Sequence, residues 1–194
     1  YAKLQDPAFK AAMIAEDHEF PDSDVRFLLE YATSAWEALY EMGPGFNYEP
    51  TPEESLRAGA AREGVSEQEF AYDLLMRQDG KGLIYFPVLN YADGNLDFLE
   101  DLQRADDCVN SLSDGGAHCG TICDAATPTF MLEYWVRDRK KGNIALADAI
   151  KRQCRDTAIL YGLEDRGLLK PGYLADLNVI DLEELQLQHP WLAF

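Results

Sequence analysis

The sequence predicts an α/β fold with a parallel sheet. A strand–helix–strand pattern covers residues 82–116: a buried apolar run GLIYFPVLNYADG (82–94), a helical stretch NLDFLEDLQRADD (95–107) and a short strand CVNSLSDGG (108–116) that breaks into glycines. A connection of this length between two strands is typical of a βαβ unit, whose strands are parallel. Helices with capping boxes precede the unit and further helices follow it, which completes the α/β pattern.

Capping residues predict where several helices begin. Asp6 before Pro7 is an N-cap followed by a favoured first helical residue, so a short helix is expected within residues 5–19. Thr51 with Glu54, and Ser66 with Glu69, are capping boxes that open two further helices. Residues 22–42 are apolar and aromatic, and their spacing does not separate helix from strand.

The second half of the chain alternates strand and helix signals. Pro87 predicts a strand end or a kink within the apolar run. Helices are expected from Pro128 through MLEYWVRDRKK and over residues 146–160. The segment LADLNVIDL alternates enough to form a terminal strand.

Charge restricts the classes of partner. The 194-residue chain carries 35 acidic and 17 basic residues, a net charge of −18. Such a surface repels phosphate backbones and anionic lipid, so neither a nucleic acid nor a membrane is an expected partner. The four cysteines are expected as reduced thiols in a cytoplasmic protein. No stretch approaches the roughly 20 apolar residues of a membrane span.

The candidate site is the segment SLSDGGAHCG (111–120). Asp114 at the end of a buried strand, followed by Gly115 and Gly116, occupies the kind of position where α/β barrels place catalytic groups. The glycines let the backbone turn and a substrate approach closely. The alternative is a turn aspartate that caps its own backbone.

His118 is open to three interpretations: a metal ligand, a donor to substrate, or a structural histidine. With Cys119 and Cys123 it resembles part of a small zinc site, but a fourth ligand is not evident, and Cys119 also fits a small buried side chain. The sequence lacks GxSxG, a P-loop, GxGxxG after a strand, and HExxH. A triad of Ser113, Asp114 and His118 is geometrically poor because the three lie in one turn.

Two longer segments resemble a known family. LSDGGAHCGTICDAATPTF (112–130) and RDTAILYGLEDRGLLKPGYLADLNVIDLEEL (155–185) are similar to the C-terminal part of the metal-dependent amidohydrolase superfamily, and closest to its N-acyl-D-amino-acid deacylase (D-aminoacylase) branch. Residues 48–75 and 83–94 also resemble that branch. The RG-LLKPG-Y-ADL element (166–177) is shared across the superfamily, whereas SDGGAH is more specific to the branch.

The resemblance implies the C-terminal part of a TIM-like (β/α)₈ barrel with a terminal strand in a small β-sandwich. It implies one or two zinc ions at the barrel mouth, with Asp114 both near the metal as a ligand and acting as general base and acid. His118, Gly115 and Gly116 would contact the substrate, a small-molecule amide. Asp114 would take a proton from water and deliver it to the leaving amine.

Two departures from the family pattern limit this interpretation. None of the three histidines forms an HxH pair, and the chain is shorter than the ~250 residues of a whole barrel. We therefore expect a C-terminal piece, with a partial barrel over 1–165 and the start of the sandwich segment over 166–194. This piece is expected to be inactive and to hold no zinc by itself, and its exposed barrel edges favour self-association.

The second departure concerns the substrate. D-aminoacylases usually carry an arginine shortly after the SDG turn, and here the nearest cation is Arg137. An acyl-D-amino acid, another linear amide and a cyclic imide all stay open as substrates. The rival hypothesis is a non-catalytic binding or structural module derived from the barrel end.

Overall fold

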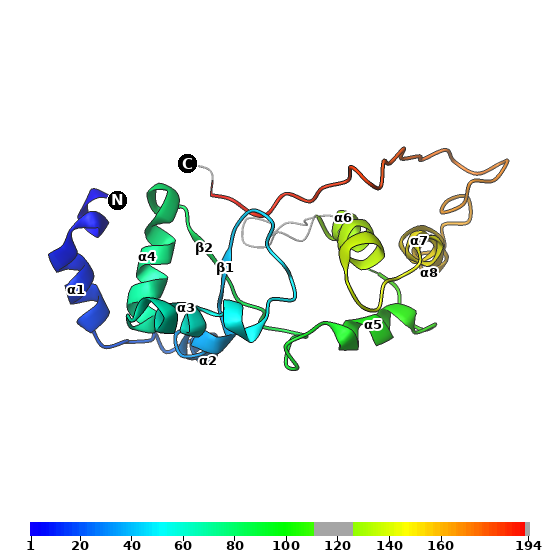
Figure 1. Cartoon of the computed structure of the whole chain (residues 1–194). Coiled ribbons are helices and arrows are strands. Elements are labelled where there is room, and N and C mark those ends of the chain that lie inside the picture. Colours follow the sequence, from blue (N-terminus) through cyan, green and yellow to red (C-terminus); the bar gives the residue numbers. More distant parts are fainter. Residues whose placement is uncertain (111–125, 193–194) are drawn as a thin grey trace. The chain divides into compact units, whose positions relative to one another are not determined.

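The computed structural model describes residues 1–110 and 126–192 of the chain (Figure 1). These residues form two compact units. The first unit runs from Tyr1 to Leu96 and takes in the residues from His189 onward, and the second unit runs from Asp97 to Gln188. The two units divide after Leu96. The boundary that the sequence predicts between the barrel and the sandwich, at 165/166, stays a prediction.

The first unit contains helices, 3₁₀ turns and two short strands. Its elements are a 3₁₀ turn Ala2–Gln5, α1 Pro7–Ala15, α2 Arg26–Ala32, a 3₁₀ turn Trp36–Ala38, β1 Tyr40–Met42, a 3₁₀ turn Pro52–Glu54, α3 Leu56–Glu63, α4 Glu67–Gly80 and β2 Leu83–Tyr85. The ambiguous residues 22–42 therefore divide between a helix, a turn and a strand.

Two of the three predicted N-caps, Asp6 and Ser66, cap helices as expected. The Asp6 carboxylate accepts a hydrogen bond from the Ala8 N–H at 2.8 Å, and Ser66 Oγ accepts one from the Glu69 N–H at 3.1 Å. At the first capping box, Glu54 accepts a hydrogen bond from the Thr51 N–H at 2.7 Å, but this box caps the start of a 3₁₀ turn instead of an α-helix. The α-helix that follows, α3, is capped by Ser55 instead.

The sheet of the described residues has two antiparallel strands. Tyr40 pairs with Tyr85, and Met42 pairs with Leu83. The predicted strand at 82–94 is present only in its first residues, because Pro87 lacks the N–H that a longer ladder needs. The predicted parallel partner of this strand covers residues 108–116. Its first residues, 108–110, form no strand, and the rest lie outside the described residues. The parallel sheet and the barrel therefore stay predictions.

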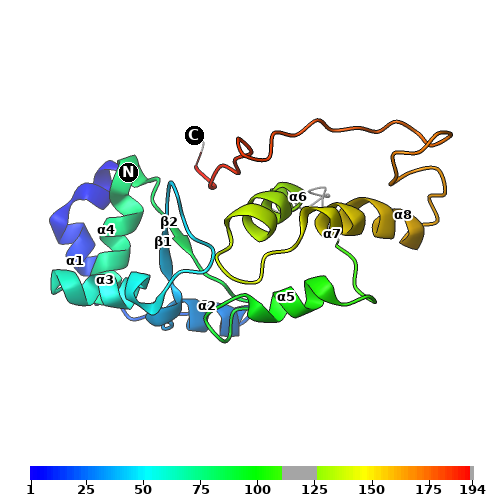
Figure 2. The ribbon, with the colours of Figure 1, turned by 45° about the vertical axis from the view of Figure 1, so that its right-hand side comes forward.

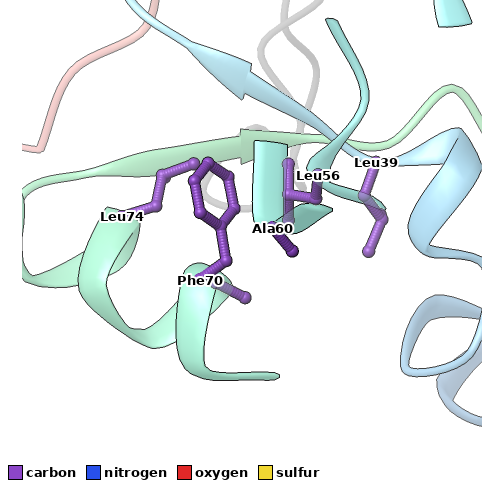
Figure 3. Packing of buried hydrophobic residues seen from close by; sticks show 6 residues of the cluster. Leu39, Leu56, Ala60, Phe70 and Leu74 are labelled. Atoms are coloured by element: carbon purple, nitrogen blue, oxygen red, sulfur yellow. The ribbon is translucent and has the colours of Figure 1, made fainter. Parts of the chain in front are cut away.

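The core of the first unit lies between α3, α4 and the sheet (Figure 3). Leu56 and Leu74 are almost fully buried, and Phe70 packs against α3. A Cβ on Gly59 would lie 2.4 Å from Cζ of the Phe70 ring, so the absence of a side chain at Gly59 lets the two helices approach this closely. The remaining buried members of this cluster are Leu39, Ala60 and Ala71.

The chain turns sharply in the last residues of α4, before β2. Gln78 and Asp79 adopt left-handed φ angles of 51° and 61°, which are uncommon for residues with side chains. The Gly82 N–H donates to the Arg77 carbonyl at 3.2 Å, and a Cβ on Gly82 would lie 2.0 Å from the Leu74 carbonyl oxygen. Only glycine fits where the returning backbone touches α4.

The second unit is helical. Its elements are α5 Asp97–Arg104, α6 Thr127–Phe130, a π-helical stretch Met131–Asp138, α7 Leu146–Ile150, a π-helical stretch Lys151–Asp156 and α8 Thr157–Leu160. Figure 2 shows α7 and α8 running in line, with the second π-helical stretch between them. Trp135, Ala149 and Ala158 are buried, and the Ile144 N–H donates to the Trp135 carbonyl at 2.9 Å.

Residues 161–188 follow as an extended segment (Figure 2). The stretch 174–182, for which the sequence predicts a strand, has no strand partner in the described part of the chain. A strand needs a neighbour to bond its N–H and C=O groups. Its place in a β-sandwich therefore stays a prediction.

Candidate functional site

The predicted site residues lie outside the described part of the chain. Asp114, Gly115, Gly116 and His118 all fall within 111–125, as do Cys119 and Cys123. The structure describes the two flanks of this segment, which end at Asn110 and resume at Ala126.

The N-terminal flank follows the end of α5. The Ala105 N–H donates to the Asp101 carbonyl at 3.1 Å, and the Cys108 N–H donates to the Ala105 carbonyl at 3.3 Å. Arg152 Nη1 donates to the carbonyls of Ala105 and Cys108, at 2.8 and 3.0 Å. A cation is favourable here, because the last carbonyls of a helix carry partial negative charge.

The C-terminal flank is the first turn of α6. Pro128 lies in this turn, where its missing N–H has no intrahelical partner to lose. The Gln153 side-chain amide donates from Nε2 to the Pro128 carbonyl at 3.2 Å. The adjacent side chains Arg152 and Gln153 therefore bond to opposite flanks of the segment that contains Asp114.

Both of these residues belong to a π-helical stretch. Thr157 Oγ1 donates to the Arg152 carbonyl, five residues earlier, at 2.8 Å. Such widened turns are frequent at functional sites. The stretch also buries Arg152, of which 9% is exposed.

A buried arginine holds α5 within the unit. The Arg139 guanidinium, with 2% of its side chain exposed, donates to Asp97 at 2.7 Å and to Glu100 at 3.1 Å. It also lies over the Trp135 ring, 4.6 Å from the centroid. Hydrogen bonds from Lys141, and then from Arg139, hold the pKa of Asp97 below its usual range. These charges are structural, since they bond to one another.

Arg137, the nearest cation after the SDG sequence, also has hydrogen-bond partners. Its Nη1 donates to the carbonyls of Leu182 and Leu185, at 2.6 and 2.7 Å, and its Nε donates to Asp138 at 2.6 Å. The hydrogen bond to Asp138 raises the pKa of Arg137. Arg137 thus anchors the extended C-terminal segment to the helix, and its guanidinium is occupied by these contacts.

The RG-LLKPG-Y-ADL element closes on itself. The Leu174 N–H donates to the Asp165 carbonyl at 2.8 Å, and Arg166 forms an ion pair with Asp176. Gly167 has a φ of +78°, and a Cβ at this position would lie 2.6 Å from the Cys154 carbonyl oxygen. The glycine is needed because the loop backbone rests on the helix that carries Arg152.

The described part of the second unit has a half-open depression of about 290 Å³. It is lined by Gln103, Arg104, Asp106, Ile144, Asp148, Lys151 and Arg152. Its cations already have partners: Arg104 bonds to Glu100, Lys151 bonds to Asp156, and Arg152 bonds to the carbonyls given above. The depression therefore presents no unpaired cation to an anionic ligand.

The metal implied by the resemblance finds no site among residues 1–110 and 126–192. In these ranges no three His, Cys, Asp or Glu side chains gather closely enough to hold a metal ion. The described residues thus do not fit a zinc centre, and Asp114 and His118 lie outside them.

The first unit places several tyrosines together. Tyr85 contacts the rings of Tyr40, Phe46 and Tyr48, with centroids 4.9–6.5 Å apart. Burial, with smaller contributions from Tyr48 and Tyr40, raises the pKa of Tyr85 to about 12. Burial also raises the pKa of Tyr91, whose hydroxyl donates to the Pro50 carbonyl at 3.1 Å. These neutral phenols pack the unit and are poor proton acceptors at pH 7.

Sequence reasoning missed Arg152 and Gln153. The sequence shows only that Arg152 lies three residues after Ala149, and residues three apart share a helix face. The structure shows that Ala149 is fully buried, so an arginine on its face needs a buried partner. The identity of that partner, two main-chain carbonyls some 45 positions away, is not encoded in any local pattern.

In the described residues no helix is both long enough and apolar enough to cross a membrane.

Comparison with known proteins identifies the family of the chain. Searches of curated proteins and of solved structures gave no match. The family model described as "Amidohydrolase family" matches residues 8–193, which is nearly the whole chain. The chain therefore belongs to the amidohydrolase family.

Proposed function

We propose that this protein is a hydrolase that cleaves a non-peptide C–N amide bond. The observation that carries the proposal is the family match over residues 8–193, which includes the SDGGAH segment. Substrates of the proposal are N-acyl-D-amino acids and related linear or cyclic amides. A (β/α)₈ barrel, of which this chain forms the last strand–helix units, belongs to the same proposal.

Asp114 is the proposed proton-transfer group. As a carboxylate it accepts a proton from the attacking water, and as a carboxylic acid it returns that proton to the nitrogen of the leaving amine. The carbonyl carbon gains one C–O bond and loses its C–N bond, so the reaction balances with water as the co-reactant. Gly115 and Gly116 leave room for the substrate, and His118 is the proposed polar contact to it.

Amidohydrolases are generally metal-dependent, and the proposal includes zinc with Asp114 among its ligands. Within residues 1–110 and 126–192 no three His, Cys, Asp or Glu side chains gather closely enough to hold the metal. The proposal also places the protein in the cytoplasm.

The test is Asp114→Asn in the protein that carries this chain, assayed on N-acyl-D-amino acids, N-acyl-L-amino acids and cyclic imides. Loss of a general acid–base group costs about 10²–10⁴-fold in rate, so kcat should fall by that range while the protein stays folded. Metal content is measured in parallel by mass spectrometry. Asp107→Asn, at an exposed aspartate close by, is the matched control and should retain activity.

Near-normal turnover of Asp114→Asn with metal bound would remove the proposed role of Asp114. Binding of amides without turnover by the unchanged protein would instead support the non-catalytic module. The first outcome removes only the role of Asp114, whereas the second selects the non-catalytic module over the hydrolase.

A further inference from the structure

We propose that Arg152 and Gln153 are positioning residues that hold both flanks of the segment containing Asp114. The contacts belong to the described residues, whereas the catalytic consequence rests on the function proposed above. Both residues belong to the helix that follows the predicted site in the sequence, and neither takes part in the proposed proton transfer.

Arg152 provides the stronger of the two anchors. Its buried guanidinium donates to two main-chain carbonyls, Ala105 and Cys108, at 2.8 and 3.0 Å. Hydrogen bonds from an ionised donor are roughly twice as strong as neutral ones. Both carbonyls follow the C-terminal end of α5, where a positive charge is electrostatically favourable. This contact fixes the direction in which the chain leaves α5.

Gln153 provides the weaker anchor on the other side. Its neutral amide makes one hydrogen bond to the Pro128 carbonyl, at 3.2 Å. Pro128 lies in the first turn of α6, which continues into the π-helical stretch Met131–Asp138 with its buried Trp135. The C-terminal flank is therefore held by packing as well as by Gln153, and loss of the Gln153 bond should have the smaller effect.

The adjacency of the two residues gives the arrangement its consequence. Arg152 and Gln153 are consecutive in one helix. The residues on both sides of 109–127 are therefore hydrogen-bonded to the same short piece of helix. Fixing the ends of a loop removes conformations in which its residues lie elsewhere. Asp114 is six residues from Cys108 and fourteen from Pro128 in the sequence, so loss of the Arg152 anchor should affect it more than loss of the Gln153 bond.

The first experiment measures hydrogen–deuterium exchange by mass spectrometry in Arg152→Met, Arg152→Lys and Gln153→Ala. Loss of the charge-assisted bonds should speed exchange of the amides in residues 105–110 by about tenfold or more in Arg152→Met. Arg152→Lys, which keeps the charge but not the fork, should give a smaller increase and stays informative if the methionine variant does not fold. Gln153→Ala should speed exchange mainly over residues 126–130.

The matched control is Arg155→Met, in the same helix. In the described part of the chain Arg155 makes no hydrogen bond to residues 105–110, so its loss should leave their exchange unchanged. Exchange in α3 and α4 of the first unit should be unchanged in every variant. Unchanged exchange at 105–110 in both Arg152 variants would overturn the anchoring role.

The second experiment measures kcat, KM and the pH profile of kcat in Arg152→Lys and Gln153→Ala. Displacement of Asp114 should lower kcat with little change in KM and shift the acidic limb of the profile, which a general loss of stability would not do. If Asp114→Asn abolishes turnover but the Arg152 and Gln153 variants keep normal kcat and pH profile, the positioning role is wrong.

Failure of the proposed function has a different signature. If Asp114→Asn keeps full activity while Arg152→Met still loosens residues 105–110, the anchor stands and the catalytic assignment of Asp114 falls. The two proposals can therefore fail independently.

Discussion

Arg139 Nη2 donates to the Asp97 carboxylate at 2.7 Å, which ties the first residue of α5 to the residue that follows the Met131–Asp138 stretch. Lys141 donates to the same carboxylate. The pair leads to a prediction for the pH dependence of stability. Hydrogen bonds from Lys141 and then Arg139 lower the pKa of Asp97 in the folded chain, so folding favours the ionised form.

The contribution of this pair should be fully present above the ordinary aspartate pKa of about 3.9 and should be lost as pH falls through the lower folded pKa. Urea unfolding across the acid range checks this. Asp97→Asn should flatten the acid limb of the stability curve, whereas Asp101→Asn on the same helix should preserve it. Parallel acid limbs in the wild type and Asp97→Asn would contradict the prediction.

Gly167→Ala should destabilise the second unit through a steric clash. A Cβ there would lie 2.6 Å from the Cys154 carbonyl oxygen, in a residue whose φ is +78°. Gly172→Ala is the matched control, because its φ is +91° but nothing lies within 4 Å of the added Cβ. Both variants lose about 1–2 kcal/mol from the left-handed backbone. The clash should make Gly167→Ala worse by a further ~1–3 kcal/mol in denaturant unfolding.

Gly59→Ala tests the packing of α3 on α4. Alanine improves helix propensity by about 1 kcal/mol over glycine, which alone would stabilise α3. Its Cβ, however, would lie 2.4 Å from the Phe70 ring, and overpacking a core costs about 1–3 kcal/mol. We expect a net loss of roughly 1 kcal/mol in the free energy of unfolding.

The double variant Gly59→Ala/Phe70→Leu decides between these two effects, because it removes the ring that meets the new Cβ. Addition of Gly59→Ala should then cost less in the Phe70→Leu background than in the wild type, by about 1 kcal/mol of coupling. Equal costs in both backgrounds would show that the ring does not limit this position.

Arg137→Met should release the segment that follows the RG element. Arg137 donates to the carbonyls of Leu182 and Leu185, so its loss removes the charged anchor of residues 182–185. Cleavage by a glutamate-specific protease after Glu183 and Glu184 should accelerate about tenfold, because the open state becomes more populated. Lys140→Met, at an exposed neighbour, is the control and should be cleaved at the wild-type rate.

The candidate site shows how far local patterns reach. The SDGGAH segment and the RG element carry the resemblance to the amidohydrolases in the sequence, and the family model that matches residues 8–193 confirms the family. The structure adds why Gly167 is required: the loop backbone lies against Cys154. Arg137, which the sequence left open as the nearest cation to the turn, is engaged by carbonyls more than 40 residues away.

The sequence by itself determined the N-caps Asp6 and Ser66, the presence of a helix within residues 95–107 and the family. These depend on interactions between residues a few positions apart, such as Asp6 with the N–H of Ala8 and Ser66 with the N–H of Glu69. Only the tertiary structure decided that β2 pairs antiparallel with β1, and that Arg152 and Gln153 bond the two flanks of the predicted site. Those contacts join residues that are far apart in the chain, and side-chain periodicity records which face of an element is buried but not which backbone it meets.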